Sequence, residues 1–165
     1  MLKSILKKAV LLSVLASLVS SITMAKDLNN RLGIGYSNSF SFNLPSIAAV
    51  YYPASNWAWT GALGIDSASN NSSFGATVGI RKIIFTEDNM NFFMGGTVSL
   101  VSQSTPTSST SGFELAALAG GEFFMHGLDN LGLIFDTGVA MSSTSTVRFR
   151  TLGESFLNAG IIFYF

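Results

Sequence analysis

The chain has 165 residues, no cysteine and a formal net charge of zero, so we expect neither a disulfide framework nor a nucleic-acid partner. Only 11% of its residues are charged, against about 25% in typical soluble domains. Such a composition leaves little surface suited to water.

Residues 1–25 have the features of a secretory signal peptide. Three lysines precede a mostly apolar stretch at residues 9–19, and small residues around Ala25 suit cleavage after that position. The alternative is an uncleaved membrane anchor, but serines interrupt the apolar stretch, which is shorter than the roughly 20 residues that a membrane helix needs. We therefore predict cleavage after Ala25 and one mature domain, residues 26–165.

The mature sequence then divides into segments in which apolar side chains alternate with small or polar ones, the period of a β-strand. In chain order, strands are predicted at residues 31–42, 46–52, 57–66, 74–84, 91–101, 113–124, 131–141 and 147–165. The phase of the segment 46–52 stays open, because both of its faces are nearly equally apolar. Eight strands are therefore predicted.

The connections between these segments alternate in character. Compact turns are predicted at residues 53–56, 86–89 and 126–130, and longer loops rich in Ser, Thr and Asn at residues 66–73, 102–111 and 142–146. In a transmembrane β-barrel the short turns are periplasmic and the longer loops extracellular. The order of connections fits such a barrel with a periplasmic N-terminus.

The last nine residues indicate what surrounds the strands. One face of this segment carries only apolar side chains, those of Leu157, Ala159, Ile161, Phe163 and Phe165. The opposite face begins with Asn158 and Gly160. This pattern is typical of a lipid-facing strand, although a buried strand of a soluble β-sandwich is the alternative. After the leader no apolar run is long enough for a membrane helix, so a membrane location requires a closed barrel.

Aromatic residues gather near the ends of the predicted strands, as in the two girdles of a transmembrane barrel. One group is Tyr51, Tyr52, Trp57, Trp59, Phe85, Phe92, Phe123, Phe163 and Phe165, and the other is Phe40, Phe42, Phe74, Phe113 and Phe149. In architecture, the mature chain resembles the small eight-stranded bacterial outer-membrane barrels of the OmpA and OmpX type. The resemblance implies an all-β, transmembrane, antiparallel up-and-down barrel in a Gram-negative outer membrane. It also implies that Phe163 and Phe165 form the signal read by the barrel-assembly machinery.

The polar faces of the strands would then line the lumen, which in an eight-stranded barrel is just wide enough for side chains. The charged residues predicted to face it are Arg31, Asp66, Arg81, Glu114, Glu122, Asp136, Arg148, Arg150 and Glu154. Both signs occur near each end, so we predict a paired network that fills the lumen. The alternative is that the many inward glycines leave a narrow passage or a small ligand cavity.

Small residues interrupt the outward face, where they would let a second barrel approach closely. They include Gly61, Ala76, Gly96, Ala117, Ala119 and Gly121. One interpretation is that the protein forms a homo-oligomer through these residues. The other is that they only make the lipid-facing surface smoother.

No catalytic, cofactor or metal site is predicted. The single histidine, His126, lies in a turn, and without cysteine the chain has no cluster with the spacing of metal ligands. We therefore expect a non-enzymatic protein with a structural or envelope role, in contact with membrane lipids and lipopolysaccharide. The alternatives are a narrow, porin-like channel and surface adhesion through the Ser- and Thr-rich loops.

Overall fold

A computed structural model describes residues 27–38, 44–144, 146–152 and 158–165. The strands are β1 (Arg31–Ser37), β2 (Ser46–Ala54), β3 (Trp57–Ala68), β4 (Asn71–Glu87), β5 (Met90–Thr105), β6 (Ser108–Phe124), β7 (Leu131–Ser143), β8 (Val147–Thr151) and β9 (Asn158–Tyr164). No helix in the described part of the chain is long and apolar enough to cross a membrane. The predicted signal peptide lies outside the described residues.

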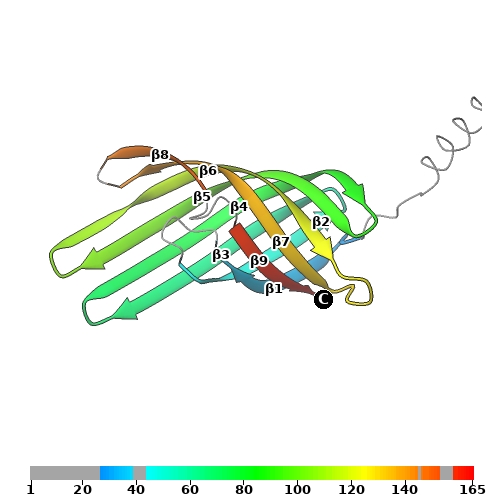
Figure 1. Cartoon of the computed structure of the whole chain (residues 1–165), viewed down its shortest axis with the longest axis horizontal. Coiled ribbons are helices and arrows are strands. Elements are labelled where there is room, and N and C mark those ends of the chain that lie inside the picture. The colour runs from blue at the N-terminus through cyan, green and yellow to red at the C-terminus, as the bar shows by residue number, and fades with distance from the viewer. Residues whose placement is uncertain (1–26, 39–43, 145, 153–157) are drawn as a thin grey trace, which may run out of the picture.

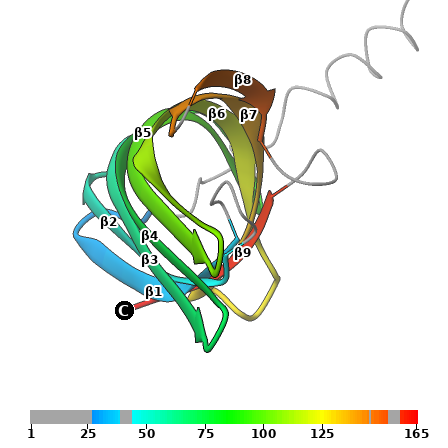
Figure 2. The same ribbon diagram turned by 90° about the vertical axis from the view of Figure 1, so that its left-hand side faces the viewer.

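The strands form one closed antiparallel barrel. Each strand from β1 to β7 pairs with the next, and the pairings of β9 with β7 and with β1 close the ring. β8 and β9 both pair with β7 and occupy successive parts of one position, so the barrel has eight strand positions. The predicted all-β, up-and-down, eight-stranded barrel is confirmed, and Figure 2 shows the ring along its length.

The two ends of the barrel differ (Figure 1). We call the end with the turns at residues 55–56, 88–89 and 125–130 the turn end. We call the opposite end, where β3–β4 and β5–β6 project as long hairpins, the hairpin end. The C-terminus lies at the turn end.

The alternation of side chains separates an apolar outward face from a mixed interior. Large apolar side chains are exposed on the outward face, for example Ile47 at 71% and Val78 at 67%. Among the described residues, four charged side chains are buried: Arg81, Glu114, Glu122 and Asp136. This distribution is the reverse of the usual one, in which charged side chains are mostly exposed.

Pairing with the neighbouring strands decides the phase of β2, which its own sequence left open. Val50 and Tyr52 are buried, whereas Ile47 and Tyr51 are exposed. Tyr51 lies opposite Trp59 of β3, which is also outward and exposed. A shift of one residue would place all of these side chains on the opposite face.

The predicted loops at residues 66–73 and 102–111 are wrong, because the structure has strands there. β3 and β4 stay paired up to a turn at residues 69–70, and β5 and β6 up to a turn at residues 106–107. Ladder hydrogen bonds join backbone groups and need no apolar side chain, so Ser and Thr continue the strands. As a result β4, β5 and β6 have 17, 16 and 17 residues.

Two predicted strands are shorter or interrupted. The first was predicted to reach residue 42 but ends at Ser37, and residues 39–43 lie outside the described part. The eighth was predicted as one strand from residue 147 to the C-terminus, whereas the structure has β8 and β9 on either side of residues 153–157, which are also outside it.

The largest cluster of buried apolar side chains fills the turn end of the interior. Its members are Leu28, Ala48, Val50, Tyr52, Ala58, Ile83, Phe93, Phe124, Ile134, Ile162 and Tyr164. Leu28 comes from the segment before β1 and is fully buried. Gly33 makes room for this packing, since a Cβ there would lie 2.6 Å from the Tyr164 ring.

Candidate functional site

At the turn end, a buried carboxylate lies between two tyrosines. Glu122 on β6 has an exposed fraction of 0%. The Tyr52 hydroxyl donates a 2.9 Å hydrogen bond to Glu122 Oε2, and the Tyr164 hydroxyl donates one to Oε1. Gly132 on β7 leaves space for the carboxylate, because a Cβ there would lie 2.7 Å from Oε1. Three strands distant in sequence thus meet through one side chain.

A buried arginine adjoins this carboxylate. Arg81 Nη1 lies 4.0 Å from Glu122 Oε2, and the guanidinium carbon lies 4.8 Å from the centroid of the Phe93 ring. Among the described residues, Nη1 has no hydrogen-bond partner, and neither do the side-chain oxygen and nitrogen of Asn91. We call Tyr52, Arg81, Phe93, Glu122 and Tyr164 the turn-end cluster.

Above this cluster, the middle of the barrel contains a cavity of about 60 Å³. Arg81, Asp136 and threonines line its polar parts, and Ala, Val, Leu, Ile and Phe side chains line the rest. Asp136 Oδ1 accepts a 2.9 Å hydrogen bond from Asn158 Nδ2 on β9. The interior is therefore filled near the turn end and partly open halfway along.

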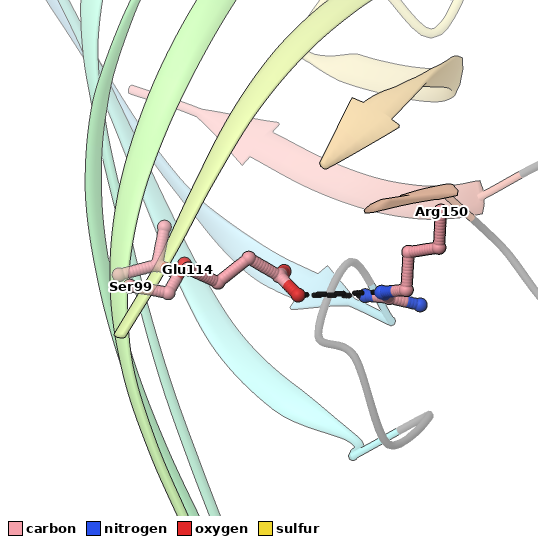
Figure 3. Close-up of polar contacts among 4 residues, drawn as sticks. Ser99, Glu114 and Arg150 are labelled. Carbon is pink, nitrogen blue, oxygen red and sulfur yellow. Dashed lines mark hydrogen bonds and ion pairs between the residues drawn. The ribbon is translucent and has the colours of Figure 1, made fainter. Parts of the chain in front are cut away.

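Toward the hairpin end, a second ion pair crosses the interior (Figure 3). Arg150 Nη2 on β8 lies 3.0 Å from Glu114 Oε2 on β6, and Arg150 Nε donates to the same oxygen at 3.3 Å. Glu114 is 2% exposed. Ser99 on β5 lies directly opposite Glu114 in the pairing of β5 with β6. The hydroxyl groups of Ser99 and of Thr77 on β4 are hydrogen-bonded to each other.

The structure brings some of the predicted lumen charges together and separates others. It pairs Arg81 with Glu122 and Arg150 with Glu114. Asp136 contacts Asn158, with Arg81 on the wall of the same cavity. The remaining predicted positions are Arg31, which is half-buried, Asp66 and Arg148, which are exposed, and Glu154, which lies outside the described residues.

The small residues predicted for barrel contact lie on the outward face and are partly exposed. Gly96 on β5 is directly opposite Ala117 on β6, and Ala119 and Gly121 follow on the same face of β6. Gly61 and Ala76 do not continue this row of small residues. Each has a large cross-strand neighbour, since Val78 lies opposite Gly61 and Leu100 lies opposite Ala76.

Several polar residues of the interior were not predicted from the sequence, among them Tyr52, Asn158 and Tyr164. Tyr164 lies between Phe163 and Phe165, so the same alternation that turns both phenylalanines outward turns this tyrosine inward. Tyr52 was assigned to an aromatic girdle because the phase of its strand was open. Asn158 was placed on the inward face without a role, since its contact with Asp136 depends on the pairing of β7 with β9.

Within the described ranges, no group of three or more His, Asp or Glu side chains is placed to hold a metal ion. The chain matches no protein-family model and no curated protein. The hydrogen bonds and ion pairs of the interior connect strands that are distant in sequence.

Proposed function

We propose that this protein is an integral outer-membrane β-barrel with a structural role in the cell envelope. The observation that carries the proposal is the reversed distribution of side chains on a closed barrel. Exposed Leu, Ile, Val, Met, Phe and Trp cover the outward face, while carboxylates and a guanidinium are buried. In hydrocarbon every backbone polar group must be paired within the protein, and a closed ring of strands does this.

The ends of the apolar face support a membrane location. Near the turn end it carries Trp57 and Trp59, whose rings are 5.3 Å apart, and Lys82, which lies opposite Trp57. An outward lysine at this height extends its ammonium group to the headgroups. Toward the hairpin end the outward face changes to a row of four serines on neighbouring strands, Ser67, Ser72, Ser104 and Ser109. We therefore place the turn end in the periplasm.

The filled interior supports a structural role over a channel. The turn-end cluster and the Glu114–Arg150 pair lie across the lumen on either side of the central cavity. A channel would have to pass both. We expect a silent trace when the folded protein is added to planar lipid bilayers, and steady single-channel steps would favour the porin-like alternative instead.

Surface attachment is a second candidate, favoured by the projecting hairpins. A transmembrane strand needs about 9–11 residues, so strands of 16 and 17 residues extend beyond the membrane. Their ends carry hydroxyl-rich side chains. Shortening both hairpins while keeping the barrel should abolish cell attachment if this candidate holds, and unchanged attachment would eliminate it.

The outward residues suggest the molecular partners. Lipid chains and lipopolysaccharide would cover the apolar face, and the exposed Phe163 and Phe165 at the C-terminus would be read by the barrel-assembly machinery during insertion. We keep self-association of barrels as a proposal to be tested by the mass of the detergent-extracted protein. A mass equal to one copy would exclude it.

Tryptophan quenching by brominated lipid tests the membrane proposal. Trp57 and Trp59 are the two tryptophans of the chain, and both are exposed on the outward face. The mature protein folded into vesicles of brominated phosphatidylcholine should lose most of its fluorescence relative to vesicles of unbrominated lipid. A protein that folds in aqueous buffer without detergent, with fluorescence unaffected by the brominated vesicles, would contradict the proposal.

A further inference from the structure

The cavity in the middle of the barrel is large enough for a guest. It measures about 60 Å³, and one water molecule needs about 10–15 Å³ of such space. Several water molecules or one small organic molecule therefore fit. Its polar lining includes Arg81, Asp136, Thr60 and Thr97, and its apolar lining includes Ala116.

Arg81 lines this cavity, and one of its guanidinium nitrogens is an unused donor. The two oxygens of Glu122 each accept a tyrosine hydroxyl, and Arg81 Nη1 stays 4.0 Å away. Arg81 is 7% exposed, and Nη1 has no hydrogen-bond partner among the described residues. Buried polar groups in folded proteins are almost always hydrogen-bonded, so this donor indicates an acceptor in the cavity.

The charges around the cavity select a neutral guest. Two carboxylates, Glu122 and Asp136, lie near the single guanidinium of Arg81, so an anion would be repelled by both. A cation has no lone pair to offer to the unpartnered Arg81 Nη1, so it would leave this donor unsatisfied. The hydroxyls of Thr60 and Thr97 supply further donors and acceptors on the same walls.

We propose that this cavity is a binding site for neutral, hydroxyl-bearing guests whose oxygen accepts a hydrogen bond from Arg81 Nη1. Water molecules and a small polyol such as glycerol share this chemistry. The inference concerns the interior of the barrel and is independent of the proposed function.

Solution NMR of the folded, processed protein in detergent micelles tests the site. The wild type should show water cross-peaks at the Arg81 guanidinium and at Thr97. Ala116→Leu, which fills the cavity, should remove them. Ala117→Leu adds the same volume on the outward face of the same strand and should leave them unchanged.

Titrations identify the guest. A saturable shift of the Arg81 signal with glycerol assigns a polyol, and water cross-peaks without that shift assign water; both support the site. Absence of both signals in the wild type, or a saturable shift with acetate or sodium instead, would overturn the proposal.

A milder variant keeps the test valid if Ala116→Leu does not fold. Thr97→Val removes one hydroxyl at nearly constant volume and should weaken the water cross-peaks or reduce glycerol affinity by about threefold to tenfold. Thr137→Val, on the outward face of β7, is the matched control and should change neither signal. Equal behaviour of the two threonine variants would overturn the assigned lining.

Discussion

Tyr52 on β2 and Glu122 on β6 meet inside the barrel, where the tyrosine hydroxyl donates a 2.9 Å hydrogen bond to Glu122 Oε2. Tyr164 does the same at Oε1, so a carboxylate with no exposed surface receives one hydroxyl at each oxygen. Burying a charge is costly unless it is paired and hydrogen-bonded. This arrangement is therefore the polar centre of the turn end, and its stability can be tested directly.

Tyr52→Phe should lower the free energy of unfolding by about 1–3 kcal/mol, because Glu122 Oε2 loses its donor while staying buried. Urea unfolding in phospholipid vesicles, followed by tryptophan fluorescence, measures the change. Tyr51→Phe removes the neighbouring hydroxyl, which is on the outward face, and should change the free energy by less than about 0.5 kcal/mol. Similar losses for both variants would count against the role of the hydrogen bond.

Gly132→Ala should destabilise the barrel by about 1–3 kcal/mol, because its Cβ would lie 2.7 Å from Glu122 Oε1 and 3.2 Å from the Tyr164 ring. Gly61→Ala is the control, since its Cβ meets nothing closer than 3.6 Å. It should stabilise the protein by about 0.5–1 kcal/mol through the lost freedom of the unfolded chain. The same unfolding assay distinguishes the two, and a neutral Gly132→Ala would show that the carboxylate moves aside freely.

Val78→Arg separates a lipid-facing surface from a water-facing one. Val78 is exposed halfway along β4, so in water an arginine there should cost less than about 0.5 kcal/mol. At the middle of a bilayer it should cost about 2–4 kcal/mol. Ser72→Arg places the same charge on the same face of β4 beyond the apolar region, and we expect little change. The comparison is made by unfolding from vesicles, and equal costs would argue against a membrane around Val78.

A double-mutant cycle between Glu114→Gln and Arg150→Gln should give a coupling energy of about 0.5–3 kcal/mol, because the two groups are in direct contact. The corresponding cycle between Glu114→Gln and Arg148→Gln should give a value near zero. Arg148 is exposed and forms no ion pair with a described residue. Equal coupling energies in both cycles would mean that the arginines stabilise Glu114 through the overall electrostatic potential at this end of the barrel and that direct contact adds nothing.

The strands with strict alternation were predictable from local sequence. Trp57, Trp59 and Leu63 fall on one face of β3 with small or polar residues between them, and the structure exposes all three. Prediction from local sequence failed where the two faces of a segment do not differ in polarity. In β2 both faces are apolar, and at residues 102–111 both faces are polar, so neither the phase of the first nor the strand structure of the second could be predicted.

The candidate site was predictable as a list of inward side chains but not as a set of contacts. Strand phase alone turns Arg148 and Arg150 to the same face, so both were predicted to face the lumen. The pairing of β7 with β8 places Arg148 opposite Ser142, and Arg150 is the one that reaches Glu114. Such contacts depend on register across several strands, which no single segment encodes.

The sequence by itself determined that this protein is all-β, with strand segments whose apolar side chains share one face, because a period of two and its turn residues are local properties of the chain. That the strands close into a ring with this face outward came from pairing between distant segments. Only the tertiary structure decided which strand fills each part of the last position, how far the hairpins extend, and which tyrosines bind the buried Glu122. Those outcomes depend on backbone hydrogen bonds between segments distant in sequence, and the register of these bonds is set when the ring closes.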